Sequence, residues 1–145
     1  PGASNIGVKS MAHVINPSAE SFSALARDVP GDTPIVMLNL LRFREQANYP
    51  DEAGYEPCSG IEAYARYSRH AARAMAASGG EVIWAGHALS HPITPPGEQW
   101  DHILMVRYPD VHAFLAMVMD ESYQQQTIHR TAALEDARLV CMQQD

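Results

Sequence analysis

The segment from Pro34 to Phe43, PIVMLNLLRF, constrains the fold more than any other part of the chain. Alternation along a strand puts Asn39 on one face and Arg42 on the other. The remaining positions of the strand carry apolar side chains on both faces. An antiparallel sheet that packs on one side normally presents polar side chains on its free side. The segment therefore predicts a strand with both faces covered, which favours a partner subunit and an enclosed space between sheets.

The composition limits the classes of protein and partner that fit. The 145 residues suggest one domain, the formal net charge is -7, and no run of Lys or Arg occurs. A surface that binds phosphates or anionic lipids needs clustered positive charge, so we expect neither a nucleic-acid nor a membrane partner. No apolar run approaches the roughly 20 residues that span a bilayer. The two cysteines are far apart, which favours a reducing, cytoplasmic location.

The first residues carry neither a secretory signal nor an initial Met. We therefore predict a flexible N-terminus over residues 1–15, part of it consistent with a tag, and a single domain over residues 16–145. A helix is expected after Asn16 and Pro17, because Asn caps helices and Pro suits the first helical position. Its apolar stripe consists of Phe22, Leu25, Ala26 and Val29.

The rest of the chain alternates between strand and helix patterns. Ser59 and Glu62 form a capping-box pattern that opens a helix, which ends near Ser78 before two glycines. Pro109 and Asp110 open another helix. Strands are expected at 81–89, 100–108 and 137–142, and a short irregular helix at 121–134.

After the N-terminal helix, this order is β-α-β-β-α-β. Two β-α-β halves with both helices on one face form a four-stranded antiparallel sheet, so the predicted fold class is α+β, of ferredoxin-like type. Two helices cover only one face of such a sheet. We expect a second copy of the sheet to cover the other face, in a twofold homodimer that forms a dimeric α+β barrel.

The succession MLNLLRF, EAYARY, GGEVIWAG, WDHILMVRYPDVHAFLAM and ESYQ…HRTAALEDARLV resembles the domain-of-unknown-function family numbered 1330, in the dimeric α+β barrel superfamily. The resemblance covers nearly everything from about Asn16 onward. It implies two ferredoxin-like sheets paired into a barrel, with a cleft in each subunit. Members of the superfamily include small monooxygenases, lactone isomerases, dehalogenating or decarboxylating enzymes and haem-dependent proteins, so the fold alone does not transmit a function.

Asn39 is the first candidate site residue, because a buried amide needs hydrogen-bond partners and an enclosed pocket needs a few polar groups. It either orients a ligand or bonds to a neighbouring loop. Arg42, on the opposite face, offers the guanidinium fork that binds a carboxylate, although a structural salt bridge would explain it equally. Arg107 has the same two interpretations.

Histidines supply the candidate proton acceptors. His87 and His91 are four residues apart at the end of a strand, and His102 could approach them across a hairpin. With Asp101 or Glu98 they would make an acid–base pair or a metal site, but three scattered histidines are weak evidence for a metal. We therefore predict no metal and no cofactor. Haem is a weaker option, because no histidine stands out as its axial ligand.

Aromatic residues could line the pocket, although core or interface packing is the commoner role of large rings. The family resemblance places a similar Trp-Asp pair at Trp100 and Asp101, at the rim of a cleft. It also carries over Tyr123 and Arg130, which would close the mouth of the cleft and bind an anionic group. The alternative for Arg130 is a loop-tethering pair with Glu135 or Asp136. The aromatic candidates are Trp84, Trp100, Tyr64 and Tyr67.

Two classes of function follow. The first is a small enzyme without a cofactor, or one that uses only oxygen, which acts like a monooxygenase or isomerase on a small apolar or aromatic metabolite in the intersheet cleft. Asn39 would orient a carbonyl or enolate, His87 or His102 would take a proton, and Arg42 or Arg130 would hold an anionic end. The second is a non-catalytic protein that binds a small ligand or only dimerises. Both need the same apolar faces, so the sequence does not separate them.

Overall fold

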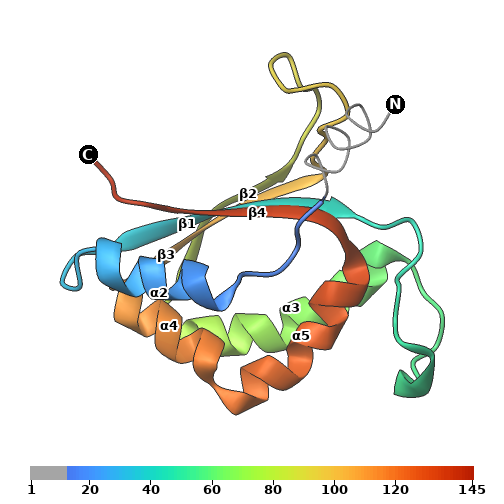
Figure 1. Ribbon diagram of the computed structural model, residues 1–145, viewed down its shortest axis with the longest axis horizontal. Coiled ribbons are helices and arrows are strands. Elements are labelled where there is room, and N and C mark those ends of the chain that lie inside the picture. The colour runs from blue at the N-terminus through green and yellow to red at the C-terminus, as the bar shows by residue number, and fades with distance from the viewer. Residues whose placement is uncertain (1–12) are drawn as a thin grey trace, which may run out of the picture.

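Four antiparallel strands form one sheet in the order β2-β3-β1-β4, with all the helices on one side of it (Figure 1). The computed structural model describes residues 13–145. The predicted ferredoxin-like α+β fold is confirmed, since the sheet order and the alternation of strands and helices are those of a β-α-β-β-α-β unit. In chain order the elements are α2 (Ala19–Asp28), β1 (Ile35–Phe43), a 3-10 turn η1 (Asp51–Ala53), α3 (Gly60–Ala77), β2 (Glu81–His87), β3 (His102–Tyr108), α4 (Val111–Met119), α5 (Glu121–Ala133) and β4 (Leu134–Met142).

Helix α3 begins where its capping residues predict. The Ser59 hydroxyl accepts from the backbone N–H of Glu62 at 3.0 Å, and the Glu62 carboxylate accepts from the Ser59 N–H at 3.4 Å. Helix α2 starts later than predicted, because Ser18 rather than Asn16 is its cap. Ser18 and Ser21 bond each other's backbone N–H groups at 3.0 Å, which satisfies two donors of the first turn.

The expected irregular helix is in fact the regular 13-residue helix α5. Asp120 caps it by accepting from the N–H groups of Ser122 and Tyr123. The N–H of Leu134 still bonds to the carbonyl of Arg130, while the backbone at Leu134 is already extended. Strand β4 therefore begins at Leu134, three residues before the predicted start at Ala137.

The N-terminal segment crosses the edge of the molecule between β4 and α5 before it enters α2 (Figure 1). The Ala137 N–H donates to the carbonyl of Val14 at 2.9 Å, and the Val14 N–H donates to Oδ1 of Asp136 at 3.3 Å. Residues 1–12, most of the stretch predicted to be flexible, lie outside the described part of the chain.

The two faces of the sheet differ in what covers them. On β1, Ile35, Met37 and Leu41 point towards the helices and are at most 2% exposed. Val36, Leu38, Leu40 and Arg42 alternate with them and point to the open face. Of the two apolar faces of this strand, the helices thus cover one, and the other is left uncovered in the single chain.

A candidate ligand pocket under the helices

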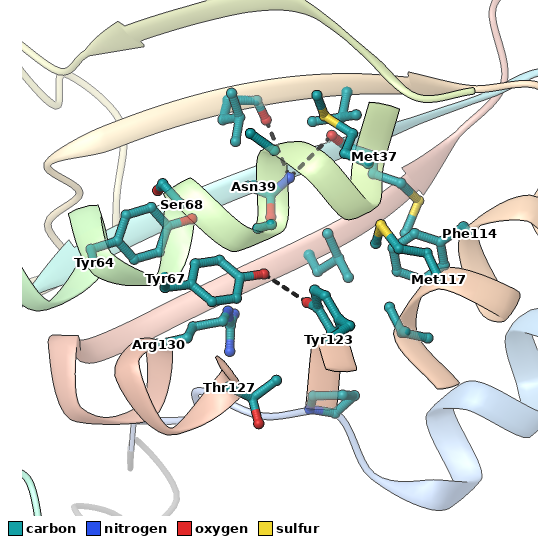
Figure 2. Close-up of a pocket in the computed structure, with 18 of the residues that line it drawn as sticks. Met37, Asn39, Tyr64, Tyr67, Ser68, Phe114, Met117, Tyr123, Thr127 and Arg130 are labelled. Carbon is teal, nitrogen blue, oxygen red and sulfur yellow. Dashed lines mark hydrogen bonds between the residues drawn. The ribbon is translucent and has the colours of Figure 1, made fainter. Parts of the chain in front are cut away.

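A pocket of about 550 Å³ lies between the helix-covered face of the sheet and helices α3, α4 and α5 (Figure 2). The sequence predicts a ligand space between the sheets of two subunits, and this pocket lies within one chain. The physical reason is that α3 presents Ser68, Ala71 and Ala72 here, which are too small to fill the space above the sheet. The apolar part of its wall consists of Met37, Leu104, Val106, Phe114, Met117, Val118 and Leu139.

Two phenols form the central polar contact of the pocket. The hydroxyl oxygens of Tyr67 on α3 and Tyr123 on α5 are 2.6 Å apart, so one hydroxyl donates to the other. Their rings meet edge to face with centroids 6.1 Å apart, and the ring of Tyr64 lies 5.3 Å from that of Tyr67. A hydroxyl pair of this kind uses one of its two protons internally and leaves the other available.

Burial raises the pKa of two phenols that line the pocket. It raises the pKa of Tyr64 to about 12, and it raises the pKa of Tyr67 well above the usual value near 10. The positive charge of Arg130 opposes both pKa shifts, but the effect of burial is larger. At neutral pH the pocket therefore contains hydroxyl donors rather than phenolates.

Arg130 on α5 points into the same end of the pocket as Tyr67 (Figure 2). One of its terminal nitrogens, Nη1, donates to the carbonyl of Ile15 and, at 3.4 Å, to Oδ1 of Asn16. The predicted alternative, a pair with Glu135 or Asp136, does not form: Asp136 binds Arg138 instead, at 2.6 Å. Within residues 13–145, Arg130 has no carboxylate partner.

Asn39 sits in the middle of β1 and lines the pocket, half-buried. Its Nδ2 donates to the carbonyl of Met37 at 3.3 Å and to that of Leu104 at 3.5 Å. Both amide protons are thus directed to backbone carbonyls, which leaves Oδ1 as the group for a ligand. Asn39 accordingly offers the pocket a hydrogen-bond acceptor and not a donor.

The two candidate histidines lie opposite each other on β2 and β3, at positions His87 and His102. His102 is half-buried and lines the pocket, whereas His87 is exposed and does not contribute to the lining. The third, His91, accepts at Nε2 from the backbone N–H of Trp100 at 3.0 Å. Among the described residues, no group of three His, Cys, Asp or Glu side chains could hold a metal ion.

Four predicted ligand-binding residues lie away from the pocket. Arg42 donates to the carbonyl of Gly97 at 3.4 Å, and Asp101 accepts from the Phe43 N–H at 2.8 Å. Trp100 is buried under the guanidinium of Arg138, which lies 5.0 Å from the ring centroid. Trp84 is 49% exposed on the open face of the sheet.

The structure thus brings together Asn39, His102, Tyr123 and Arg130 of the predicted site, along with Tyr64 and Tyr67 from the aromatic candidates. The sequence analysis missed Thr127, which lies one helical turn before Arg130 on the same face of α5, and Pro17 of the N-terminal segment. The 3- and 4-residue spacing of Tyr123, Thr127 and Arg130 was the available signal, because such residues share one face of a helix.

The fold and this pocket define a ferredoxin-like α+β protein with an internal site of the size that small molecules occupy. The model of the family described as domain of unknown function, DUF1330, matches residues 58–144, and the chain belongs to this family. No curated protein matches the chain. No helix within residues 13–145 has both the length and the apolar character needed to cross a membrane.

Solved structures support the same assignment. A protein of unknown function from Rhodopseudomonas palustris is 38% identical, covers 93% of this chain and 98% of its own, and superposes with a TM-score of 0.84. A methylated form of that protein gives 38% identity, 93% and 97% coverage and a TM-score of 0.85. A hydroxynitrile lyase from Passiflora edulis is 12% identical over 79% of this chain and 95% of its own, with a TM-score of 0.52, and shares the fold alone.

Proposed function

We propose that the protein binds a small, mostly apolar metabolite in the pocket between its sheet and helices α3, α4 and α5. The observation that supports this is a space of about 550 Å³ with an apolar wall and a few polar groups that converge on it. Pockets for small molecules have this size and this composition. The polar groups are the hydroxyl pair of Tyr67 and Tyr123, the amide oxygen of Asn39 and the guanidinium of Arg130.

A pair of matched substitutions on α3 tests this proposal. Ala71 lines the pocket, whereas Ala76 is exposed and does not. Neutral probes such as indole and benzyl alcohol should raise the melting temperature of the wild type and of Ala76→Phe, because a ligand specific to the folded state stabilises it. Ala71→Phe fills the pocket and should abolish the shift while the protein stays folded. Equal shifts in both variants would contradict the proposal.

A second candidate function, a proton-transfer enzyme of isomerase type, is favoured by His102. It is the one histidine among the described residues that line the pocket. In this reaction the neutral imidazole takes a proton from the carbon next to a carbonyl, and the electron pair moves onto the carbonyl oxygen. The free hydroxyl proton of the Tyr67–Tyr123 pair would stabilise that oxygen, and His102 would return the proton to a different carbon.

Deuterium exchange distinguishes the proton-transfer enzyme from a protein that only binds the ligand. With phenylacetone in D₂O as probe, the wild type should accelerate exchange next to the carbonyl, as followed by proton NMR. His102→Gln should lose the acceleration, and His87→Gln should retain it, because His87 is exposed and does not line the pocket. If the wild type binds the probe without accelerating exchange, the enzyme assignment fails and the binding function stands.

We also propose that the open face of the sheet pairs with a second copy of the chain. Strand register aligns Trp84, Met105, Leu38 and Val140 in one apolar row across all four strands. Trp84 and Val140 at the ends of the row are 49% and 46% exposed in the single chain. A continuous exposed apolar area of this kind favours association. The Trp84 ring lies over Gly86, and a Cβ added at Gly86 would come within 2.7 Å of the ring.

Light scattering during size-exclusion chromatography tests the homodimer. We expect the wild type and Ile93→Asp to elute as dimers, because Ile93 is 94% exposed and lies outside the sheet. Leu38→Asp places a charge in the centre of the apolar row and should yield a monomer that keeps the circular dichroism spectrum of the fold. A monomeric wild type at micromolar concentration would refute the pairing.

A further inference from the structure

We propose that the ligand of this pocket is a monoanion, a carboxylate on an apolar body, whose charged end binds Arg130 beside the hydroxyl pair of Tyr67 and Tyr123. This inference rests on the proposed ligand-binding function of the pocket. It adds the charge of the ligand and its orientation.

The charge of the pocket is the first argument. Arg130 lines it, and no Asp or Glu is present among the described residues that do so. Residues 1–12, PGASNIGVKSMA, contain no acidic residue that could supply a counter-charge from the N-terminal segment. The nearest acids in sequence do not neutralise Arg130 either: within residues 13–145 Glu135 forms no ion pair, and Asp136 binds Arg138 at 2.6 Å. A guanidinium that faces an apolar wall in this way is complementary to an anionic ligand.

The hydrogen-bonding state of Arg130 is the second argument. Its contacts to Ile15 and Asn16 both use Nη1. Its Nε and Nη2 donate to no other residue within 13–145, although both carry protons on the same planar edge. This edge has the fork geometry that binds the two oxygens of a carboxylate. The N-terminal segment therefore positions the guanidinium and leaves its carboxylate-binding edge unused.

The phenol pair is the third argument. One proton of the pair is used in the 2.6 Å contact between the hydroxyl oxygens of Tyr67 and Tyr123, and the other is free to donate. Because burial raises the pKa of Tyr67, the pair presents a neutral donor rather than a negative charge to an incoming anion. Thr127 lies at the same end of the pocket, but its hydroxyl donates to the carbonyl of Gln124 at 2.7 Å, so the phenol pair is the hydroxyl donor there (Figure 2).

The opposite end of the pocket suits the apolar body. Met37, Phe114 and Met117 lie there, away from Arg130 (Figure 2). Of these, Met117 accepts a hydrogen bond from the buried hydroxyl of Tyr108 at 3.7 Å, so this phenol adds no free donor at the apolar end. The pocket is therefore polar at one end and apolar at the other, and the ligand is oriented by this difference.

An isosteric pair of probes tests the inference: 3-phenylpropanoate and 3-phenylpropanamide, which share a shape and differ in charge. Isothermal titration calorimetry should show the carboxylate binding to the wild type about 10-fold more tightly than the amide, because bidentate charged hydrogen bonds add to a shared apolar contact. Arg130→Met should remove this preference and keep amide binding. Arg130→Lys keeps the positive charge but lacks the planar fork of the guanidinium, so it should retain only part of the preference for the carboxylate.

Arg69→Met is the matched control, since Arg69 is an exposed arginine on α3 that does not line the pocket. It should leave the preference for the carboxylate intact. Equal binding of both probes to the wild type, or a preference that survives Arg130→Met, would overturn the anion inference and leave the pocket as a site for neutral ligands. If neither probe binds and Ala71→Phe changes no ligand-induced shift, the proposed function fails together with the inference.

Discussion

Helices α3 and α5 contribute to two clusters of tyrosine, arginine and histidine residues on different sides, and only one of the clusters borders the pocket. The pocket cluster consists of Tyr67, Tyr123 and Arg130. The loop cluster, which we define as Tyr49, Tyr55, Arg66 and His129, faces the segment around η1. Arg66 and Tyr67 are consecutive, as are His129 and Arg130, and neighbouring residues of a helix point about 100° apart.

The loop cluster is a network of side chains that contact one another. Arg66 donates to the hydroxyl oxygen of Tyr49 at 3.3 Å, and the Tyr49 hydroxyl shares a hydrogen bond with Nδ1 of His129 at 2.7 Å. The ring of Tyr55 covers both, with centroids 4.8 Å from Tyr49 and 4.9 Å from His129. The same residue types therefore hold a loop in one cluster and border a cavity in the other.

The largest expected effect is a difference in the free energy of unfolding between substitutions in the loop cluster and in the pocket cluster. His129 is 6% exposed, so His129→Ala leaves a cavity and an unpaired Tyr49 hydroxyl and should lower the free energy of unfolding by about 3 kcal/mol. Arg130→Met should lower it by about 1 kcal/mol, the usual worth of a hydrogen bond, because it loses only the tether to the N-terminal segment. Urea denaturation followed by circular dichroism measures both. Similar losses would mean that the two clusters have the same structural role.

A pair of hydroxyl deletions gives an intermediate effect. Tyr49→Phe should destabilise the protein by about 1–2 kcal/mol, since it removes two hydrogen bonds of a partly buried network. Tyr67→Phe combined with Tyr123→Phe should cost about 1 kcal/mol and, in addition, weaken binding of 3-phenylpropanoate about 10-fold, because the free proton of the pair is lost. The informative measurement is calorimetric titration of both variants. Weaker carboxylate binding in Tyr49→Phe alone would reverse the assignment of the clusters.

Acid should destabilise the protein through His129 of the loop cluster. Burial, and then the positive charges of Arg66, His70 and Arg69, lower the pKa of His129 below 6.5. The unfolded chain therefore takes up this proton first, so the contribution of His129 is complete above pH 6.5 and is lost as pH falls towards the lowered pKa. Thermal denaturation between pH 7.5 and 5 should show this slope, and His129→Leu should flatten it. An unchanged slope in that variant would assign the acid sensitivity to another group.

The smallest expected effect is the alkaline counterpart at Tyr64, which packs on Tyr67 of the pocket cluster. Because the pKa of Tyr64 is raised to about 12, its stabilising contribution is complete below pH 10 and is lost as pH rises towards 12. Absorbance at 295 nm should show fewer phenols ionising near pH 10 in the folded protein than in urea. Tyr64→Phe should reduce the late-ionising fraction. A titration that is identical in the folded and unfolded states would contradict burial of these rings.

Local patterns in the sequence were sufficient for the fold. The double-faced strand, the capping pair of Ser59 and Glu62, and the cap at Asp110 each act within a few residues, so the order of the elements followed from them. The cap of α2 was missed, because Asn16-Pro17 and Ser18-Ser21 are both plausible starts. Only the reciprocal bonds of the two serines distinguish them.

The candidate site was only partly predictable, because it depends on long-range register. Strand β2 has a bulge between Val82 and Trp84, at Ile83. Without this extra residue, Trp84 would share the face of Val82, which lines the pocket. The bulge turns it to the open face instead. Asp101 was misassigned for a related reason, since its carboxylate serves the Phe43 N–H beside the irregularity in β1.

The position of the two tryptophans has a practical consequence. Trp84 lies on the open face at 49% exposure, and Trp100 is 6% exposed beneath Arg138. Neither lines the pocket, and the chain has no other indole. Acrylamide quenching of the intrinsic fluorescence therefore monitors the shielding of one sheet surface, with Trp100 as an internal standard, and does so without interference from whatever occupies the interior.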